Sequence, residues 1–348
     1  MATFQILSFD GGGIRGAFGT RLLQTFEEKL GRPITDYFDL VAGTSTGAIL
    51  GAGVAHGMSG KQLVDFYTDY GDKIFRPRES YQPKSWVKTI YPLVKYVFNK
   101  RTDGGKIDDF FRARFCPVAL KYSFDEGFGN ATLGDLRKSR LLVSTVNLSQ
   151  GKTYVFRTPH LPTAGDDRHL NIVDVLLAAT AAPTYFPHKV MPDGDAYCDG
   201  ALWAIDPAIL AVAEAFKIRQ FCTRPKCDPA YDTSSIRVLS IGTGSATYSL
   251  SPPGSDAGAL YWAPRVADVM TTSQVQGLQS PLEYLLGDRY EKINFDLPDK
   301  TWTLDNTRRI PDLFEMGLKV GENVFDRVAK TFFSEPKPQD FVPFTYED

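Results

Sequence analysis

Cysteine and histidine are scarce in this chain, which has 348 residues but only four of each. Four cysteines in a chain of this length do not make the disulfide framework of a small secreted domain. Neither residue type shows the spacing of a zinc site, and no calcium loop pattern occurs. We therefore expect reduced thiols, no bound metal, no cofactor and a cytoplasmic protein.

Long hydrophobic runs and an excess of one charge are also missing. The best candidate for a membrane span, 172–186, is short and contains Asp174 and Pro183, and the N-terminus lacks the basic and apolar regions of a signal peptide. Lys and Arg number 39 against 41 Asp and Glu, which gives a formal net charge of -2 and no basic field for DNA or RNA. Any membrane contact should therefore be peripheral.

Hydrophobic residues, in contrast, make up 43% of the chain, enough for a sizeable core. The chain opens with two units in which an apolar run of strand type ends in a glycine-containing turn and a helical pattern follows. The strands are expected at 4–9 and 37–42, and the helices at 17–30 and from 47 to about 54. Two such units favour a parallel sheet with crossover helices and an α/β fold.

The remaining pattern adds a hairpin, two helices and a strand. These elements are expected at 141–148 with 153–157, at 172–182, from Asp206-Pro207 to 216, and at 237–241. Stretches 224–235, 251–258 and 334–348 are rich in Pro, Ser, Asp or Gly and should be loops or a tail. No repeat or linker divides the chain, so we expect one domain over 1–348.

A nucleophile turn is indicated by Gly43-Thr44-Ser45-Thr46-Gly47, which is a G-x-S-x-G sequence between a strand and a helix. Gly43 and Gly47 let the chain turn sharply and let the strand and helix approach closely. Ser45 would then stand at the positive end of the following helix.

The glycine run after the first strand has two interpretations. Consecutive N–H groups of Gly11, Gly12 and Gly13, with the positive charge of Arg15, could stabilise a developing oxyanion. The same run, through Gly16, matches the G-x-G-x-x-G fingerprint of dinucleotide-binding proteins. In those proteins an acidic residue should close the second strand, whereas here that strand closes on the serine turn.

The residue that takes the proton from the serine is indicated by the absence of a histidine in the later part of the chain. In α/β-hydrolases the histidine follows the acid, but no histidine occurs after His188 in this chain. This leaves a carboxylate acting directly on the serine, and Asp199, before Gly200 at a strand end, is placed for that work. A carboxylate is a weak base for a hydroxyl, so burial that raises its pKa should help.

Residues 73–106 are the one local charge anomaly, with nine Lys or Arg against two acids and interleaved aromatics. Such a stretch suits a lipid headgroup surface. It could equally be a solvated helical face that covers the core.

Taken together, these motifs resemble those of the patatin-like phospholipases. That family carries G-G-G-x-R-G for the oxyanion, G-x-S-x-G for the nucleophile and D-G-[GA] for the aspartate of a Ser–Asp dyad. The matching segments appear in family order at Gly11–Gly16, Gly43–Gly47 and Asp199–Ala201. The resemblance covers roughly 4–245 and implies a three-layer α/β/α sandwich with a mostly parallel central sheet and a Ser nucleophile elbow. Residues 246–348 would be a C-terminal extension packed on it, and 334–348 a tail that can be flexible.

A narrower likeness, through 9–20, 30–50 and 263–290, is to the bacterial phospholipase effectors of CBASS anti-phage defence. It implies activation by a cyclic dinucleotide, degradation of the inner membrane from its cytoplasmic face, and a homo-oligomer. The effector-binding residues are not indicated. Two alternatives remain at this stage: a constitutive soluble acyl-ester hydrolase, and a dinucleotide-binding regulatory protein that uses Gly11–Gly16.

Overall fold

The computed structural model describes residues 2–78, 112–161, 167–221, 231–246 and 266–344, together with Gly258 and Trp262. From residue 79 onward, the basic and aromatic stretch 73–106 lies outside these residues. Among the residues described, none of the helices combines the length and the hydrophobicity of a membrane span.

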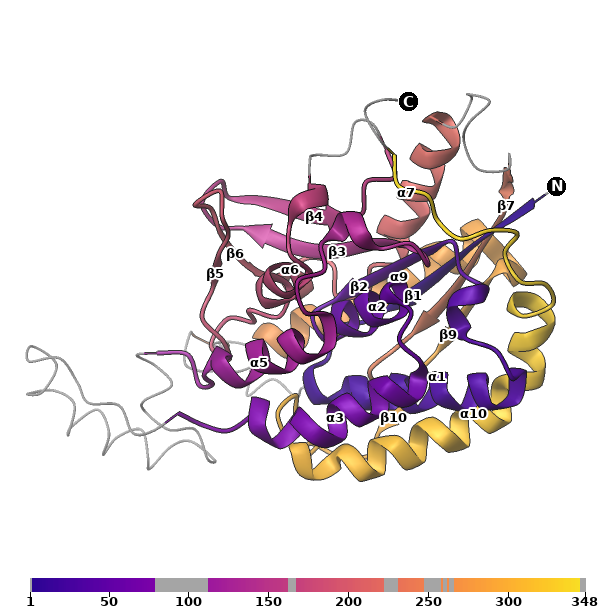
Figure 1. Cartoon of the computed structure of the whole chain (residues 1–348). Coiled ribbons are helices and arrows are strands. Elements are labelled where there is room, and N and C mark those ends of the chain that lie inside the picture. The colour runs from indigo at the N-terminus through magenta and orange to yellow at the C-terminus, as the bar shows by residue number, and fades with distance from the viewer. Residues whose placement is uncertain are drawn as a thin grey trace, which may run out of the picture.

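A mostly parallel sheet of eight strands forms the middle layer (Figure 1). Its order is β5-β6-β3-β2-β1-β7-β9, and β4 pairs with β3. The strands are β1 (Ala2–Phe9), β2 (Leu40–Thr44), β3 (Arg140–Asn147), β4 (Lys152–Arg157), β5 (Lys189–Val190), β6 (Ala196–Asp199), β7 (Tyr231–Ile241) and β9 (Tyr290–Ile293). The pairs among β3, β2, β1, β7 and β9 are parallel, whereas β4, β5 and β6 pair antiparallel. Two short strands, β8 (Ser245–Ala246) and β10 (Asp296–Leu297), form a separate parallel pair.

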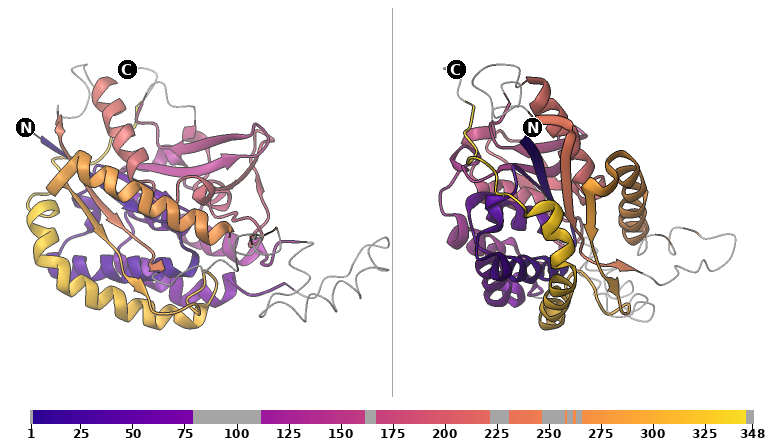
Figure 2. Two further views of the ribbon diagram at one scale, coloured as in Figure 1. Left: turned by 180° about the vertical axis from the view of Figure 1, so that it is seen from behind. Right: turned by 90° about the vertical axis from the view of Figure 1, so that its right-hand side faces the viewer.

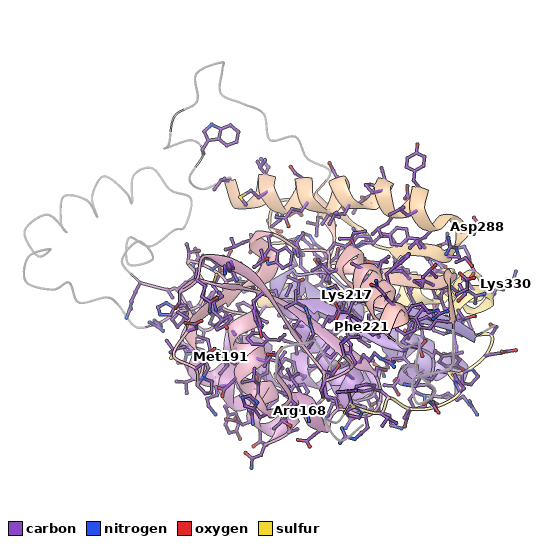
Figure 3. All side chains as sticks on the ribbon, turned by 90° about the horizontal axis from the view of Figure 1, so that it is seen from above. Arg168, Met191, Lys217, Phe221, Asp288 and Lys330 are labelled. Carbon is purple, nitrogen blue, oxygen red and sulfur yellow. The ribbon has the colours of Figure 1, made fainter. Side chains whose placement is uncertain are left out.

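Helices cover both faces of the sheet (Figure 2). One face carries α1 (Gly16–Leu30), α2 (Thr46–His56), α3 (Gly60–Ile74), α5 (Pro117–Phe128), α6 (Ile172–Ala179) and α10 (Ile310–Phe332). The other carries α7 (Ala208–Phe221) and α9 (Val266–Leu286). Figure 3 shows α9 along the outside of the molecule, with side chains projecting away from the rest of the protein.

The period of two in a strand explains the layers. In β1, Leu7 and Phe9 belong to the core on the α1 face, while Phe4 and Ile6 belong to the core on the α7 face. A strand that is apolar on both faces must be covered on both faces. The expected three-layer α/β/α sandwich is therefore confirmed.

Several predicted boundaries were wrong. The second strand begins at Leu40 and not at 37, because Tyr37 and Phe38 precede it and pack against the ring of Phe333. The helix expected to reach 182 ends at Ala179, where the backbone of Thr180 leaves the helical conformation.

Two other segments are longer than predicted. Residues 231–235 belong to β7 and not to a loop, because Tyr231 packs on Phe4, with ring centroids 4.5 Å apart. Helix α7 continues to Phe221, beyond the expected residue 216. Aromatic contacts across elements override the polar composition that favoured a loop at 231–235.

Candidate active site

The motif residues meet where the central strands end. Phe9 pairs with Gly43 and with Ile241, and Thr44 pairs with Ser144. On the far side of β3, Asp199 pairs with Thr145. These pairings therefore place three features close together at one end of the strands: the glycine run, Ser45 and Asp199. This is the carboxyl end of the parallel strands, where α/β proteins bind ligands.

Ser45 lies on a sharp turn between β2 and α2. Its φ of 55° and ψ of -123° put a non-glycine residue in the left-handed half of the backbone map. It occupies the N-cap position of α2, yet its side chain makes no cap hydrogen bond. The hydroxyl is therefore not used by the helix, and the positive end of the helix dipole lies beneath it.

The turn is possible because the flanking positions carry no side chain. A Cβ atom on Gly47 would lie 2.2 Å from the carbonyl oxygen of Phe9, and one on Gly43 would lie 2.1 Å from the carbonyl oxygen of Gly47. The helix thus sits directly against the end of β1. This approach also brings Ser45 next to Gly11, where an added Cβ would be 3.3 Å from the Ser45 Cβ.

Asp199 is 1% exposed and ends β6. Its Oδ1 accepts the N–H of Ala201 at 2.8 Å, and the ring N–H of Trp203 donates to Thr145 O at 3.0 Å. These two bonds hold the turn Gly200–Leu202 that follows the aspartate.

The pKa of Asp199 reflects this burial. Desolvation raises the pKa from 3.8 to about 6, and hydrogen bonding to the side chain of Ser45 and to Ala201 N–H opposes the rise. Oδ2 has no partner within normal hydrogen-bond limits among the described residues, so the contact with Ser45 is a loose one. Such bonds are often long before substrate arrives and tighten in the complex.

None of the four histidines, all of them in described residues, hydrogen-bonds to Ser45 or Asp199. His188 is exposed, and His160 is buried against Glu214, 3.1 Å away. The described residues also hold no cluster of His, Cys, Asp or Glu that could bind a metal. The arrangement is therefore a serine beside a buried carboxylate.

The glycine run supplies two N–H groups rather than three. Gly11 N–H donates to Ile205 O at 2.9 Å and is already used, whereas Gly12 and Gly13 N–H have no acceptor within the described part of the chain. Arg15 is bonded back to Gly12 O through its backbone N–H at 3.2 Å and through Nε at 3.4 Å. Arg15 therefore orients the loop as well as adding positive charge.

The dinucleotide-binding alternative finds no support in this geometry. A pyrophosphate would need the free N–H groups at the start of the helix that follows the glycine run, but Ile14 N–H already donates to Leu304 O at 2.8 Å. Asp36, the acidic residue near the position that the dinucleotide fingerprint requires, lies in a 3₁₀ turn before β2 and does not close that strand. Gly11–Gly16 is a turn packed against protein and not an open phosphate loop.

Three contacts around the site were not predicted from the sequence. Lys292 of β9 binds Asp10 and Asp206, Thr243 Oγ1 donates to Gly11 O at 2.6 Å, and Gln274 Oε1 accepts Ile205 N–H at 3.2 Å. For the first of these contacts the sequence offers one signal, a lysine within the short strand sequence Tyr290–Ile293. The sequence alone does not show that this lysine meets Asp10, because that depends on which strands are neighbours in the sheet.

The chain matches one protein family and resembles three bacterial proteins along most of its length. The family profile described as "Patatin-like phospholipase" matches residues 7–212, more than half of the chain. This range contains Gly11, Ser45 and Asp199.

Three bacterial relatives carry the name "cGAMP-activated phospholipase". The one from Pseudomonas aeruginosa is 30% identical over 343 residues, which cover 97% of this chain and 92% of the relative. The one from Vibrio cholerae is 37% identical over 256 residues, 71% of this chain and 66% of the relative. The one from Escherichia coli is 33% identical over 256 residues, 71% of this chain and 64% of the relative. The matched region thus spans about two thirds of the last two relatives.

Proposed function

Since this chain belongs to the patatin-like phospholipase family and is an enzyme of that class, we propose that it hydrolyses acyl esters of membrane glycerophospholipids with Ser45 as nucleophile and Asp199 as base. The observation that carries the proposal is the pairing of Ser45, whose hydroxyl does not cap its helix, with a buried carboxylate of raised pKa. Such a pairing gives the weak base the proton affinity that it needs.

In the first half of the reaction, Ser45 Oγ attacks the ester carbonyl and its proton passes to the Asp199 carboxylate. The carbonyl oxygen becomes an oxyanion, for which the N–H groups of Gly12 and Gly13 are the donors. The C–O bond to the glycerol then breaks, and Asp199 returns its proton to the leaving lysophospholipid alkoxide. The product is an acyl ester of Ser45.

In the second half, Asp199 takes a proton from water as the water attacks the acyl ester. The same N–H groups hold the second oxyanion. When that intermediate collapses, the proton returns to Ser45 Oγ and the fatty acid leaves. None of these steps requires a group from outside the protein other than water and lipid.

The regulation is proposed from the relatives. Three of them are named for activation by cGAMP, at 30–37% identity. We propose that a cyclic dinucleotide of this kind switches the enzyme on during phage infection, and that a homo-oligomer then degrades the cell's own membrane from the cytoplasmic side. A ligand that binds the active arrangement more tightly shifts the population towards it. The basic and aromatic stretch 73–106 is our candidate for peripheral contact with lipid.

The test is hydrolysis of a fluorogenic phospholipid in vesicles by the purified chain, with and without each cyclic dinucleotide. We expect cGAMP to raise the rate and a linear dinucleotide to leave it unchanged. Ser45→Ala and Asp199→Asn should each abolish fatty acid release while circular dichroism shows a folded protein. Near-normal activity of Asp199→Asn would contradict the proposal that Ser45 and Asp199 form a catalytic dyad. Equal rates with every nucleotide would instead indicate a constitutive hydrolase.

A further inference from the structure

Lys292 is a buried lysine that belongs to none of the motifs. Its ammonium group lies 2.7 Å from each carboxylate oxygen of Asp10, 2.7 Å from Oδ2 of Asp206 and 3.0 Å from Oγ of Ser240. The side chains of Lys292, Asp10 and Asp206 are 5%, 3% and 1% exposed. A lysine has three N–H donors, so these contacts use all of them.

The two carboxylates belong to different segments of the candidate site. Asp10 directly precedes the glycine run, and its own N–H donates to Ile241 O at 3.0 Å. Asp206 directly follows Ile205, in the segment that connects Asp199 to α7, and its Oδ1 accepts Ala208 N–H at 2.9 Å. The two segments also join directly through the bond from Gly11 N–H to Ile205 O at 2.9 Å. One ammonium group therefore links the segment of the oxyanion donors with the segment of the base.

The charges make this link necessary. Burial, and then the neighbouring charge of Asp206, raise the pKa of Asp10, while the ammonium group of Lys292 opposes the rise and favours the ionised carboxylate. Without the ammonium group, two buried carboxylates would repel each other across the point where the segments meet. Repulsion there would move Gly11, and with it the N–H groups of Gly12 and Gly13.

We propose that Lys292 is a positioning residue for the reaction: by binding Asp10 and Asp206 together, it holds the oxyanion donors at the height of Ser45. It acts through these carboxylates and does not touch the substrate. Lys292 lies beyond residues 7–212, so strand β9 supplies support that the family-matched region lacks. The inference rests on the proposed function.

The experiment compares two variants. Lys292→Met removes the ammonium group and leaves two facing carboxylates. Lys292→Met combined with Asp10→Asn removes one positive and one negative charge, so the cluster keeps its net charge but loses the ionic link and the lysine hydrogen bonds to Asp206 and Ser240. The matched control is Lys337→Met. The Lys337 side chain is also 5% exposed, but it bonds to Phe38 O and Ser139, which lie before β2 and β3 at the end of the strands away from Ser45.

Turnover is measured with a p-nitrophenyl fatty acid ester in the presence of cGAMP, together with labelling of Ser45 by a fluorophosphonate. An oxyanion contact forms in the transition state, so its loss lowers kcat and leaves KM nearly unchanged. We expect the charge-balanced double variant to lose about 10²-fold in kcat, the scale of an ångström-sized misplacement. Labelling should slow in parallel, and Lys337→Met should keep its kcat.

A folded double variant with a kcat within about twofold of the parent would overturn the proposal, because no transition-state contact would then have been lost. A rise in KM with kcat unchanged would mean that Lys292 supports substrate binding and not an oxyanion contact, and would also overturn the proposal. Loss of the folded state in both Lys292 variants would make Lys292 a residue of stability alone, with the same consequence. The proposed function fails separately: in that case the parent itself shows no turnover or labelling that depends on Ser45.

Discussion

A carboxylate is an inefficient base for a hydroxyl group, and burial is the means by which the base that we propose, Asp199, would gain proton affinity. The carboxylate is 1% exposed, and desolvation raises its pKa to about 6. A base is most effective when its pKa lies near the working pH. The raised pKa brings Asp199 close to that range and leaves most of it ionised at neutral pH.

This pKa predicts an acid limb of the rate profile. In the proposed reaction Asp199 must be ionised to accept the Ser45 proton, so kcat/KM for a soluble ester should fall about tenfold for each pH unit below about 6. An aspartate of ordinary pKa would keep its rate down to about pH 4. The profile from pH 4.5 to 8 decides between them, with circular dichroism at each pH to exclude unfolding. A flat profile down to pH 4.5 would contradict the assignment of Asp199 as base.

The same burial has a cost in stability. A carboxyl whose pKa is raised on folding stabilises the protein below its unfolded pKa of 3.8, and that contribution is lost as pH rises through about 6. The difference amounts to on the order of 3 kcal/mol. Asp199→Asn mimics the protonated form and can keep the bond from Ala201 N–H.

We therefore expect Asp199→Asn to raise the free energy of unfolding at pH 8 by about 1–3 kcal/mol, while it abolishes activity. The gain should shrink as pH falls towards 4, because the folded parent then buries a protonated carboxyl and no longer a charged one. Urea titrations at pH 8 and pH 4.5 measure the two differences. Asp195→Asn is a useful control, because hydrogen bonds to Asn147 and Gln150 lower the pKa of this carboxyl, so its replacement should not stabilise. A destabilised Asp199→Asn at pH 8 would contradict the reasoning.

At the scale of elements, the strands and turns that hold the candidate site were predictable, because each is encoded locally. An apolar run followed by glycines defined β1 and its turn, and G-x-S-x-G between two apolar segments defined the elbow at Ser45. The end of α6 and the start of β7 were not predictable, because contacts such as Tyr231 on Phe4 join residues far apart in sequence. Lys292 was missed for the same reason.

Helix α10 illustrates such long-range packing, since it lies along α1 on the outside of the sheet (Figure 1). Two glycines on α10 face α1. A Cβ on Gly317 would lie 2.4 Å from the carbonyl oxygen of Phe18, whereas one on Gly321 would lie 3.1 Å from the side chain of Thr25. The first contact is far shorter than atoms tolerate and involves backbone on both helices, whereas the second is relieved when the neighbouring atoms shift by a few tenths of an ångström.

These two positions should therefore respond differently to the same change. Gly317→Ala should destabilise by about 1–3 kcal/mol, because α10 must move away from α1. Gly321→Ala should be nearly neutral, because the crowding is offset by up to about 1 kcal/mol from the better helix propensity of alanine. Urea denaturation of the two variants tests this. Equal effects would show that the helices do not approach each other as closely as described.

For the whole molecule, the C-terminal part is built into the same layers as the motif-bearing part. Strand β9 extends the sheet beside β7, Leu304 O binds Ile14 N–H, and the ring of Phe333 contacts Phe38. Towards the end of the chain, Phe341 is buried and lies under the guanidinium of Arg140, 4.9 Å away. We propose that 1–348 folds as one domain.

One domain predicts one unfolding transition for probes placed in both parts. Trp203 reports on the turn after Asp199, and Trp302, 8% exposed, reports on the C-terminal part. The chain has four tryptophans, so replacing Trp86 and Trp262 with Phe, and then either Trp203 or Trp302, leaves a single reporter each time. Coincident urea midpoints by fluorescence and circular dichroism are the expected result, because two-state unfolding gives the same curve for every probe. If the Trp302 signal were lost at lower urea while the Trp203 signal persisted, the C-terminal part would be a separate unit. In that case strand β9, which carries Lys292, would unfold independently of the strands that carry Ser45.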